Sequence, residues 1–235
     1  MIILIIIMGI VAGWMTNALS DRLPRSSGRV KSPADGPIPL ALPAVVRLLK
    51  AARAGRGARR PPLLEELAIE LGSAAFLAIL WQVYGASQEF GLYCASFFYL
   101  LLIALIDLKH RLVLNMMIYP AILLVLAGHG ITADQPLRHV LLGGGMAFAI
   151  FFLTAWLKPG QLGFGDVKLA TLIGIGLGFP AILWALILGT GAAGMVTIWL
   201  LASRGASLKT QLPYAPFLCL GAMIALFYTP HFMLI

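Results

Sequence analysis

Long apolar runs set the strongest limit on what this chain can fold into. A membrane-spanning helix needs about 20 predominantly apolar residues, and the sequence offers eight candidate runs. They lie at 1–19, 63–84, 90–107, 114–129, 138–157, 167–178, 181–202 and 213–235. The composition agrees, with 60% hydrophobic and 11% charged residues, because soluble domains carry roughly twice that share of charge. We predict an all-α polytopic membrane protein with about eight transmembrane helices, of which the sixth is short and glycine-rich.

The basic residues predict how these helices are oriented. With the N-terminus outside, all of the 17 Lys and Arg residues except Arg138 fall in inside loops or at inner helix ends. Cytoplasmic loops of membrane proteins carry such an excess of basic residues. Eight spans then leave both termini non-cytoplasmic, and the expected location is the plasma (cytoplasmic or inner) membrane. The net charge of +8 follows from topology, so no nucleic-acid partner is expected.

Three segments organise the chain. Residues 1–19 lack a basic start and a clear cleavage site, which favours a retained first helix over a removed signal peptide. Residues 20–62 form a basic cytoplasmic loop, within which 44–53 carry a basic residue at every third position. That pattern suits either an amphipathic helix on anionic lipid or a plain topogenic loop. Residues 63–235 form the membrane-embedded domain.

Two acids stand at the ends of apolar runs. Asp107 ends the third run and Asp166 opens the sixth, and the predicted topology brings both to the cytoplasmic membrane face. An ionisable group at membrane level costs about 3 kcal/mol on insertion scales and is a functional-site hypothesis by default. Each acid also has a simpler interpretation, since Asp107 could belong to solvated loop and Asp166 could be a helix-capping acid.

A pair of neighbouring carboxylates can carry out acid–base chemistry. When two carboxyl groups share a proton, one is held ionised and the other protonated. The ionised group can take a proton from water while the protonated group donates to the carbonyl under attack. Gly163 and Gly165 flank Asp166 closely and could let an extended peptide approach the backbone. A tight turn between helices is the alternative role for these glycines.

The segment Gly-Phe-Gly-Asp-Val-Lys at 163–168 resembles the GxGD motif of the type IV prepilin peptidases. This family of intramembrane aspartyl proteases also includes the archaeal preflagellin peptidases. Asp107 and Asn115 are similar to the family's first catalytic aspartate and its downstream Pro-Asn, with Leu114 where proline is common. Further similarity lies at 17–24, at Glu70 and at 213–222.

The resemblance implies an enzyme that removes the leader of prepilins or pseudopilins at the cytoplasmic face. Asp107 and Asp166 would be the catalytic pair, without a metal. Gly163, Gly165, Lys168 and Glu70 would bind substrate, although Lys168 could equally be a topogenic lysine and Glu70 an acid stabilised by its helix dipole. The expected partners are membrane lipid and a substrate with a basic leader and an apolar helix. The oligomeric state stays open.

The sequence departs from many bacterial members in its cysteines. Those members carry two CxxC pairs in the first cytoplasmic loop, a spacing that suits zinc, and they also methylate the new N-terminus. Residues 20–62 contain no cysteine, and Cys94 and Cys219 lie within apolar runs. No thiolate zinc site can form in that loop. The peptidase reaction needs no cofactor, and S-adenosylmethionine becomes one only if a methyltransferase activity is present.

Two other classes of function fit the same acids. A transporter or channel could use Asp107 and Asp166 as ion or proton sites. Such a protein usually holds its acids near the bilayer midplane and often has inverted repeats, whereas here both acids are expected at one face and no repeat is found. A catalytically inactive scaffold of the same fold is the third hypothesis. The sequence favours the peptidase.

Overall fold

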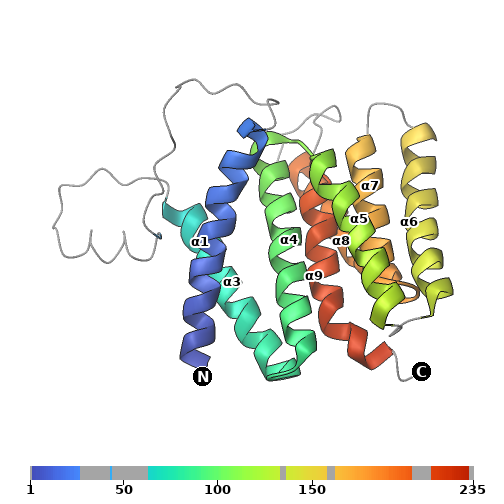
Figure 1. The fold of residues 1–235 in the computed structure, drawn as a ribbon. Helices are drawn as coiled ribbons and strands as arrows, with labels where there is room; N and C mark the ends of the chain where they lie inside the picture. The colour runs from blue at the N-terminus through green and yellow to red at the C-terminus, as the bar shows by residue number, and fades with distance from the viewer. Residues whose placement is uncertain are drawn as a thin grey trace. The chain divides into compact units, whose positions relative to one another are not determined.

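The computed structural model describes residues 2–26, 43, 63–132, 136–157, 162–202 and 213–232, and all regular structure in these ranges is α-helical (Figure 1). The helices are α1 (Ile2–Ser26), α3 (Leu63–Tyr84), α4 (Gln88–His110), α5 (Asn115–Thr132), α6 (Leu137–Leu157), α7 (Phe164–Leu177), α8 (Ala181–Ala202) and α9 (Ala215–Phe232). The predicted amphipathic helix at 44–53 lies outside the described residues, as do residues 27–42 and 54–62 of the predicted basic loop.

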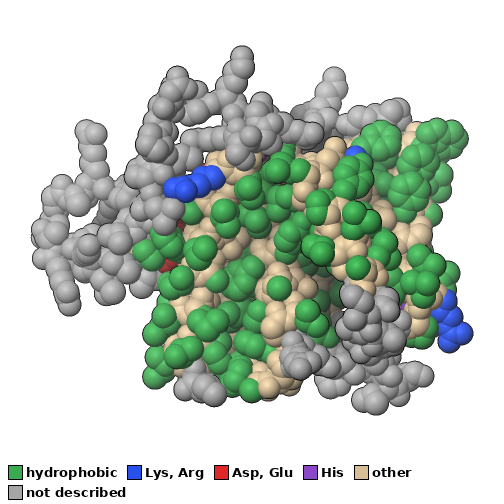
Figure 2. Space-filling view, viewed as in Figure 1, with side chains coloured by type: hydrophobic (Ala, Val, Ile, Leu, Met, Phe, Trp, Pro, Cys, Tyr) green, Lys and Arg blue, Asp and Glu red, His purple; other side chains and the backbone are tan. Residues whose placement is uncertain are grey.

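Five of the described helices are long and apolar enough to cross a membrane. Their spanning stretches are Ile2–Pro24, Glu65–Tyr84, Phe90–His110, Leu137–Leu157 and Ala181–Trp199. Shorter apolar stretches occur in α5 and α9, at Asn115–Ala127 and Ala215–Phe227. On the face drawn in Figure 2 hydrophobic side chains prevail, and the visible Lys and Arg side chains lie toward its edges. The prediction of an all-α polytopic membrane protein is confirmed.

Several helix boundaries differ by a few residues from those expected, among them the end of α1 and the start of α7. Helix α1 continues to Ser26, beyond the apolar run that ends at residue 19, and α7 begins at Phe164, ahead of the run at 167–178. An apolar run measures only the part of a helix that can lie in hydrocarbon, whereas backbone hydrogen bonding can continue into polar residues. The consequence for function is that Asp166 lies inside the first turn of α7 rather than before it.

The chain forms two compact units, residues 1–105 and 106–235. In the first unit α1 packs on α3. A Cβ added to Gly9 would lie 3.0 Å from the backbone nitrogen of Ala74, so the two backbones approach closely. Aromatic side chains connect α3 to α4, with the rings of Phe76 and Phe97 stacked at a centroid distance of 3.9 Å.

The second unit is built around the short helix α7, which contacts α5, α6, α8 and α9. Figure 1 shows α7 between α5 and α6. Glycines allow the closest of these approaches, because small residues let membrane helices pack backbone against backbone. Gly143 of α6 faces Gly174 of α7, and Gly189 of α8 faces Gly221 of α9. These contacts fix the helix that carries Asp166 from several sides.

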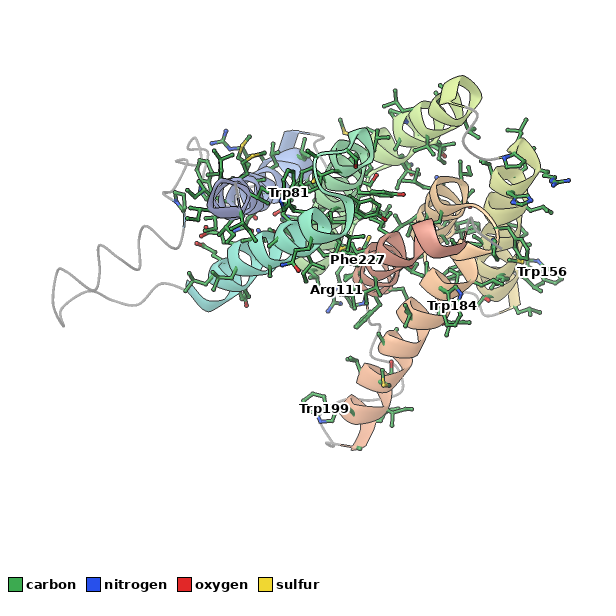
Figure 3. The ribbon with its side chains drawn as sticks, turned by 90° about the horizontal axis from the view of Figure 1, so that it is seen from below. Trp81, Arg111, Trp156, Trp184, Trp199 and Phe227 are labelled. Carbon is green, nitrogen blue, oxygen red and sulfur yellow. The ribbon has the colours of Figure 1, made fainter. Side chains whose placement is uncertain are left out.

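Exposed tryptophans mark the ends of two helices in this unit. Trp156 is 70% exposed near the end of α6, and Trp199 is 67% exposed near the end of α8. Figure 3 shows Trp199 toward the far end of α8 from Trp184. Tryptophan is enriched at membrane–water interfaces, where one end of the ring system is apolar and the other is wet. This placement is the one expected for membrane-spanning α6 and α8.

The glycine packing of α7 predicts that two neighbouring Gly→Ala substitutions differ in their effect on stability. In Gly174→Ala the new Cβ would lie 2.9 Å from the carbonyl carbon of Gly143 and 3.0 Å from the Cβ of Ala147. Overpacking of this kind costs about 1–3 kcal/mol, so we expect a lower thermal unfolding midpoint in detergent. Gly176→Ala is the matched control, since nothing lies within 4 Å of its new Cβ. Equal midpoints for the two variants would contradict the packing.

Candidate functional site

Asp107 lies in the last turn of α4 and is 6% exposed. The backbone N–H of Ala215, the first residue of α9, donates a hydrogen bond to its carboxyl group. The buried Oδ2 of Asp107 has no hydrogen-bond partner among the described residues. A buried carboxyl oxygen without a partner costs free energy unless something else satisfies it. This oxygen is therefore available to a water molecule or a substrate group.

Asp166 lies in the first turn of α7 and is 9% exposed. The backbone N–H of Gly163 donates to its Oδ2 over 3.3 Å, and the N–H of Asp166 donates to the Gly163 carbonyl over 3.0 Å. These two bonds pair backbone groups that a helix start leaves unsatisfied. An acid in this position is also stabilised by the positive end of the helix dipole. The interpretation of Asp166 as a first-turn acid is thus correct, and it is compatible with a role in chemistry.

The two carboxylates lie close enough to interact electrostatically. Both belong to the second compact unit, although 58 positions of sequence lie between them. Cys219 of α9 is fully buried and lies within electrostatic range of both acids. Arg111, labelled in Figure 3, follows α4 and places a positive charge within range of Asp107. The last residues of α4, the first turn of α7 and the beginning of α9 therefore each contribute a group within range of the buried acid pair.

The four-residue connection between α4 and α5 packs against residues 163–168, which are called the glycine segment below. A Cβ added to Gly165 would lie 2.8 Å from the Cβ of Val113, so only glycine fits here without movement. Gly163 is different, because its φ of −78° suits any residue and, among the described residues, an added Cβ would make only ordinary contacts, with the Oδ2 of Asp166 at 3.5 Å and the backbone nitrogen of Gly165 at 3.9 Å. Of the two glycines, Gly165 is required by packing, while Gly163 leaves its side of the turn exposed.

Lys168 contacts α5. Its Nζ donates to the Oδ1 of Asn115 over 3.0 Å and lies 5.0 Å from the centroid of the Tyr119 ring. Residues two apart on a helix project on nearly opposite sides, so Lys168 leaves α7 on the side away from Asp166. The predicted role of this lysine in binding substrate is not tested by these contacts, which give it partners within the chain.

Glu70 belongs to the first unit and is buried in α3, where α1 packs against that helix. A Cβ added to Gly13 of α1 would lie 3.2 Å from the Cα of Glu70. The similarity at 17–24 falls on α1 in the same unit. Substrate binding by Glu70 stays a prediction.

Three residues at the site have no counterpart among those singled out from the sequence. Cys219 lies inside an apolar run and Val113 is in a connection. His110 follows Asp107 by about one helical turn, and its buried Nε2 has no hydrogen-bond partner in the part of the chain that the structure describes. Ala215 falls within the similarity at 213–222, but only the fold brings its N–H to Asp107. Among the described residues, no three His, Cys, Asp or Glu side chains gather where they could hold a metal ion.

The fold and the acid pair define a polytopic helical membrane protein with two interacting carboxylates buried at helix ends. A family model described as the type IV leader peptidase family matches residues 94–229. That stretch includes both acids and the whole glycine segment. The chain belongs to the type IV leader peptidase family.

Curated relatives agree with this assignment. The chain is 30% identical over 175 residues to a prepilin leader peptidase/N-methyltransferase of Xanthomonas campestris pv. campestris, covering 71% of this chain and 58% of the relative. It is 27% identical over 166 residues to the protein of the same name from Pseudomonas putida, covering 68% and 57% respectively. The match thus spans somewhat more than half the length of these relatives. No solved structure matches the chain.

The two motif glycines should respond differently to the same substitution. Gly165→Ala forces Val113 to move, and we expect a loss of about 1–2 kcal/mol of stability, measured as a lower unfolding midpoint. Gly163→Ala is the matched control and should leave the midpoint unchanged. Val113→Gly removes the Cβ that the new side chain would meet at 2.8 Å, so Gly165→Ala should cost less stability in that background than in wild type. A Gly165→Ala protein as stable as wild type would rule out this contact.

Proposed function

We propose that the chain is an intramembrane aspartyl endopeptidase that cleaves the leader from type IV prepilins or pseudopilins, with Asp107 and Asp166 as its catalytic pair. The observation that carries the proposal is the buried, electrostatically interacting acid pair in a chain of the leader peptidase family. Two acids are rarely buried together without a reason, because each loses its hydration and repels the other.

The proposed reaction uses the pair as base and acid. The ionised carboxylate takes a proton from a bound water, whose oxygen attacks the carbonyl carbon of the scissile peptide bond. The protonated carboxyl group donates its proton to the carbonyl oxygen. As the C–N bond breaks, the carboxyl group that took the water proton gives it to the leaving amine, and the other carboxylate takes back a proton from a hydroxyl of the tetrahedral intermediate, which restores the pair. The partnerless Oδ2 of Asp107 supports a role for that oxygen in holding the water or the substrate carbonyl.

The two backbone hydrogen bonds support a fixed geometry for this chemistry. Asp166 is held by Gly163 within its own helix start, and Asp107 is held by Ala215 from a different helix. Each carboxyl group thus has one anchored side, which reduces the orientations that it can adopt. Positioned catalytic groups gain rate because little ordering remains to be done in the transition state.

The substrate class follows from the family and from the location of the pair. The relatives are named prepilin leader peptidase/N-methyltransferase, and a prepilin carries a basic leader followed by an apolar helix. Such a helix would lie in the membrane beside the enzyme while its leader meets the cytoplasmic face. The exposed Gly163 and the neighbouring Phe164, which is 66% exposed, support the glycine segment as the surface that the peptide backbone meets.

The location of both acids at helix ends favours the peptidase over an ion transporter. Asp107 lies in the last turn of α4 and Asp166 in the first turn of α7, whereas transporter sites usually lie near the bilayer midplane. N-methylation with S-adenosylmethionine is not part of the proposal, because the cytoplasmic loop lacks the cysteines that accompany it in many family members.

The acid pair can be tested with charge-neutral substitutions of nearly equal shape. In membranes that contain a prepilin, we expect Asp107→Asn and Asp166→Asn each to lower the cleavage rate by at least about 10²-fold, since each removes a group that must titrate. Glu65→Gln is the matched control, because Glu65 is an exposed acid at the start of α3. Immunoblotting should find all four proteins at equal abundance. Cleavage that survives either Asp substitution would overturn the paired-acid mechanism.

The proposed orientation can be tested with an impermeant thiol reagent. In a background with Cys94 and Cys219 changed to Ala, Lys109→Cys marks the end of α4 and Ser87→Cys marks the connection before it. Both positions are exposed. We expect Lys109→Cys to react in inside-out vesicles and Ser87→Cys in right-side-out vesicles, because one span of α4 lies between them. The reverse pattern would place the acid pair on the outer face.

A further inference from the structure

Lys168 is the one positively charged side chain within the glycine-segment helix α7, and it is half-buried. An ammonium group at membrane level costs about 3 kcal/mol unless it is compensated. The chain supplies that compensation from α5, where the amide oxygen of Asn115 accepts a hydrogen bond at 3.0 Å and the Tyr119 ring presents its face at 5.0 Å. Asn115 and Tyr119 are four residues apart and therefore share one side of α5. Lys168 thus contacts α5 at two points.

The N-terminus of α5 is closely connected to Asp107. Only residues 111–114 separate it from α4, and each end of this connection is hydrogen-bonded. The N–H of Arg111 donates to the Asp107 carbonyl over 2.8 Å, and the Leu114 carbonyl accepts from Met117 over 3.0 Å. Leu114 is also buried. The connection is therefore short, and a shift of Asn115 has only these four residues in which to be absorbed before it reaches the end of α4.

Two contacts join residues 113–115, which follow Asp107, to residues 165–168 of α7, which include Asp166. One is the packing of Val113 against Gly165, and the other is the hydrogen bond from Lys168 to Asn115. Gly165 precedes Asp166 and Lys168 follows it by two residues, so the contacts lie on both sides of the acid in sequence. A change in either contact would let α5 and α7 shift relative to each other.

We propose that Lys168 is a positioning residue, which ties α7 to the N-terminus of α5 and thereby fixes the separation of Asp107 and Asp166. This inference rests on the proposed function, since a fixed separation matters for a reaction that uses both acids. It differs from a substrate-binding role, because the ammonium group is engaged within the chain and leaves α7 on the side away from Asp166.

Lys168→Met tests the positioning role of the contact between Lys168 and Asn115. Methionine keeps most of the apolar stem of lysine but removes the charge and the hydrogen-bond donors. We expect the kcat for prepilin cleavage to fall about 10- to 100-fold, since small displacements of catalytic groups have effects of this size, while KM changes less than about twofold. Asn115→Leu should give the same loss. Arg138→Met is the control at an exposed basic residue of α6 and should leave both constants unchanged.

The double variant shows whether Lys168 and Asn115 act through their shared contact or through two separate effects on kcat. Lys168→Met and Asn115→Leu remove the same contact, so the double variant should be no slower than either single one. Asn115→Asp keeps an acceptor for the ammonium group and should restore kcat to within about threefold of wild type. A raised KM with unchanged kcat in Lys168→Met, together with a wild-type-like Asn115→Leu, would instead make Lys168 a substrate-binding residue and overturn the tie.

The contact between Lys168 and Asn115 can also be tested without substrate, so that the result does not depend on the proposed function. Thermal unfolding midpoints of the two single variants and the double variant form a second cycle. Non-additive midpoints support the contact, and additive midpoints overturn it. If Asp107→Asn still cleaves prepilin, the proposed function fails whatever this cycle shows. If the acid pair is essential but Lys168→Met and Asn115→Leu both cleave at the wild-type rate, the positioning role of Lys168 is overturned and the proposed function stands.

Discussion

The burial of two carboxylates beside each other is the constraint on which the second unit depends. Asp107 and Asp166 are both nearly inaccessible and lie within electrostatic range of each other. Desolvation and mutual repulsion both oppose this arrangement. The chain offsets part of the cost with one backbone N–H for each acid, from Ala215 and from Gly163. Among the described residues the Oδ2 of Asp107 has no hydrogen-bond partner, so part of the cost of burial stays uncompensated there.

The short helix α7 can carry one of these acids because it is held on several sides. Its glycine face meets α6 at Gly143 and Gly144, while its first turns meet the 111–114 connection and α5. Membrane helices gain little from the hydrophobic effect when they associate, so close van der Waals packing has to supply the difference. Glycine provides that packing without polar atoms, which leaves the few polar contacts of the unit concentrated near the acids.

Asp166 and Lys168 show that neighbouring residues of one motif can face different partners. In the segment 163–168, Asp166 is directed into the pair while Lys168 contacts the neighbouring helix through Asn115. From α9, Cys219 lies within range of both acids as a small, apolar wall. The resemblance to the prepilin peptidases implies roles for the acids and glycines, but it does not distinguish a lysine that binds substrate from one that contacts a neighbouring helix.

The sequence by itself determined the helical membrane fold, since the lengths of apolar runs at 63–84 and 181–202 match α3 and α8 residue for residue. It also identified Asp107 and Asp166, because an acid at the end of an apolar run is costly wherever the chain goes. Helix continuation past an apolar run, as in α1, was missed because hydropathy measures solvent preference and not hydrogen bonding. Only the tertiary structure decided that Ala215 and Cys219 meet the acids, that Gly165 meets Val113 and that Lys168 meets Asn115. Contacts between segments so distant in sequence depend on the rotation and register of packed helices, which no local pattern encodes.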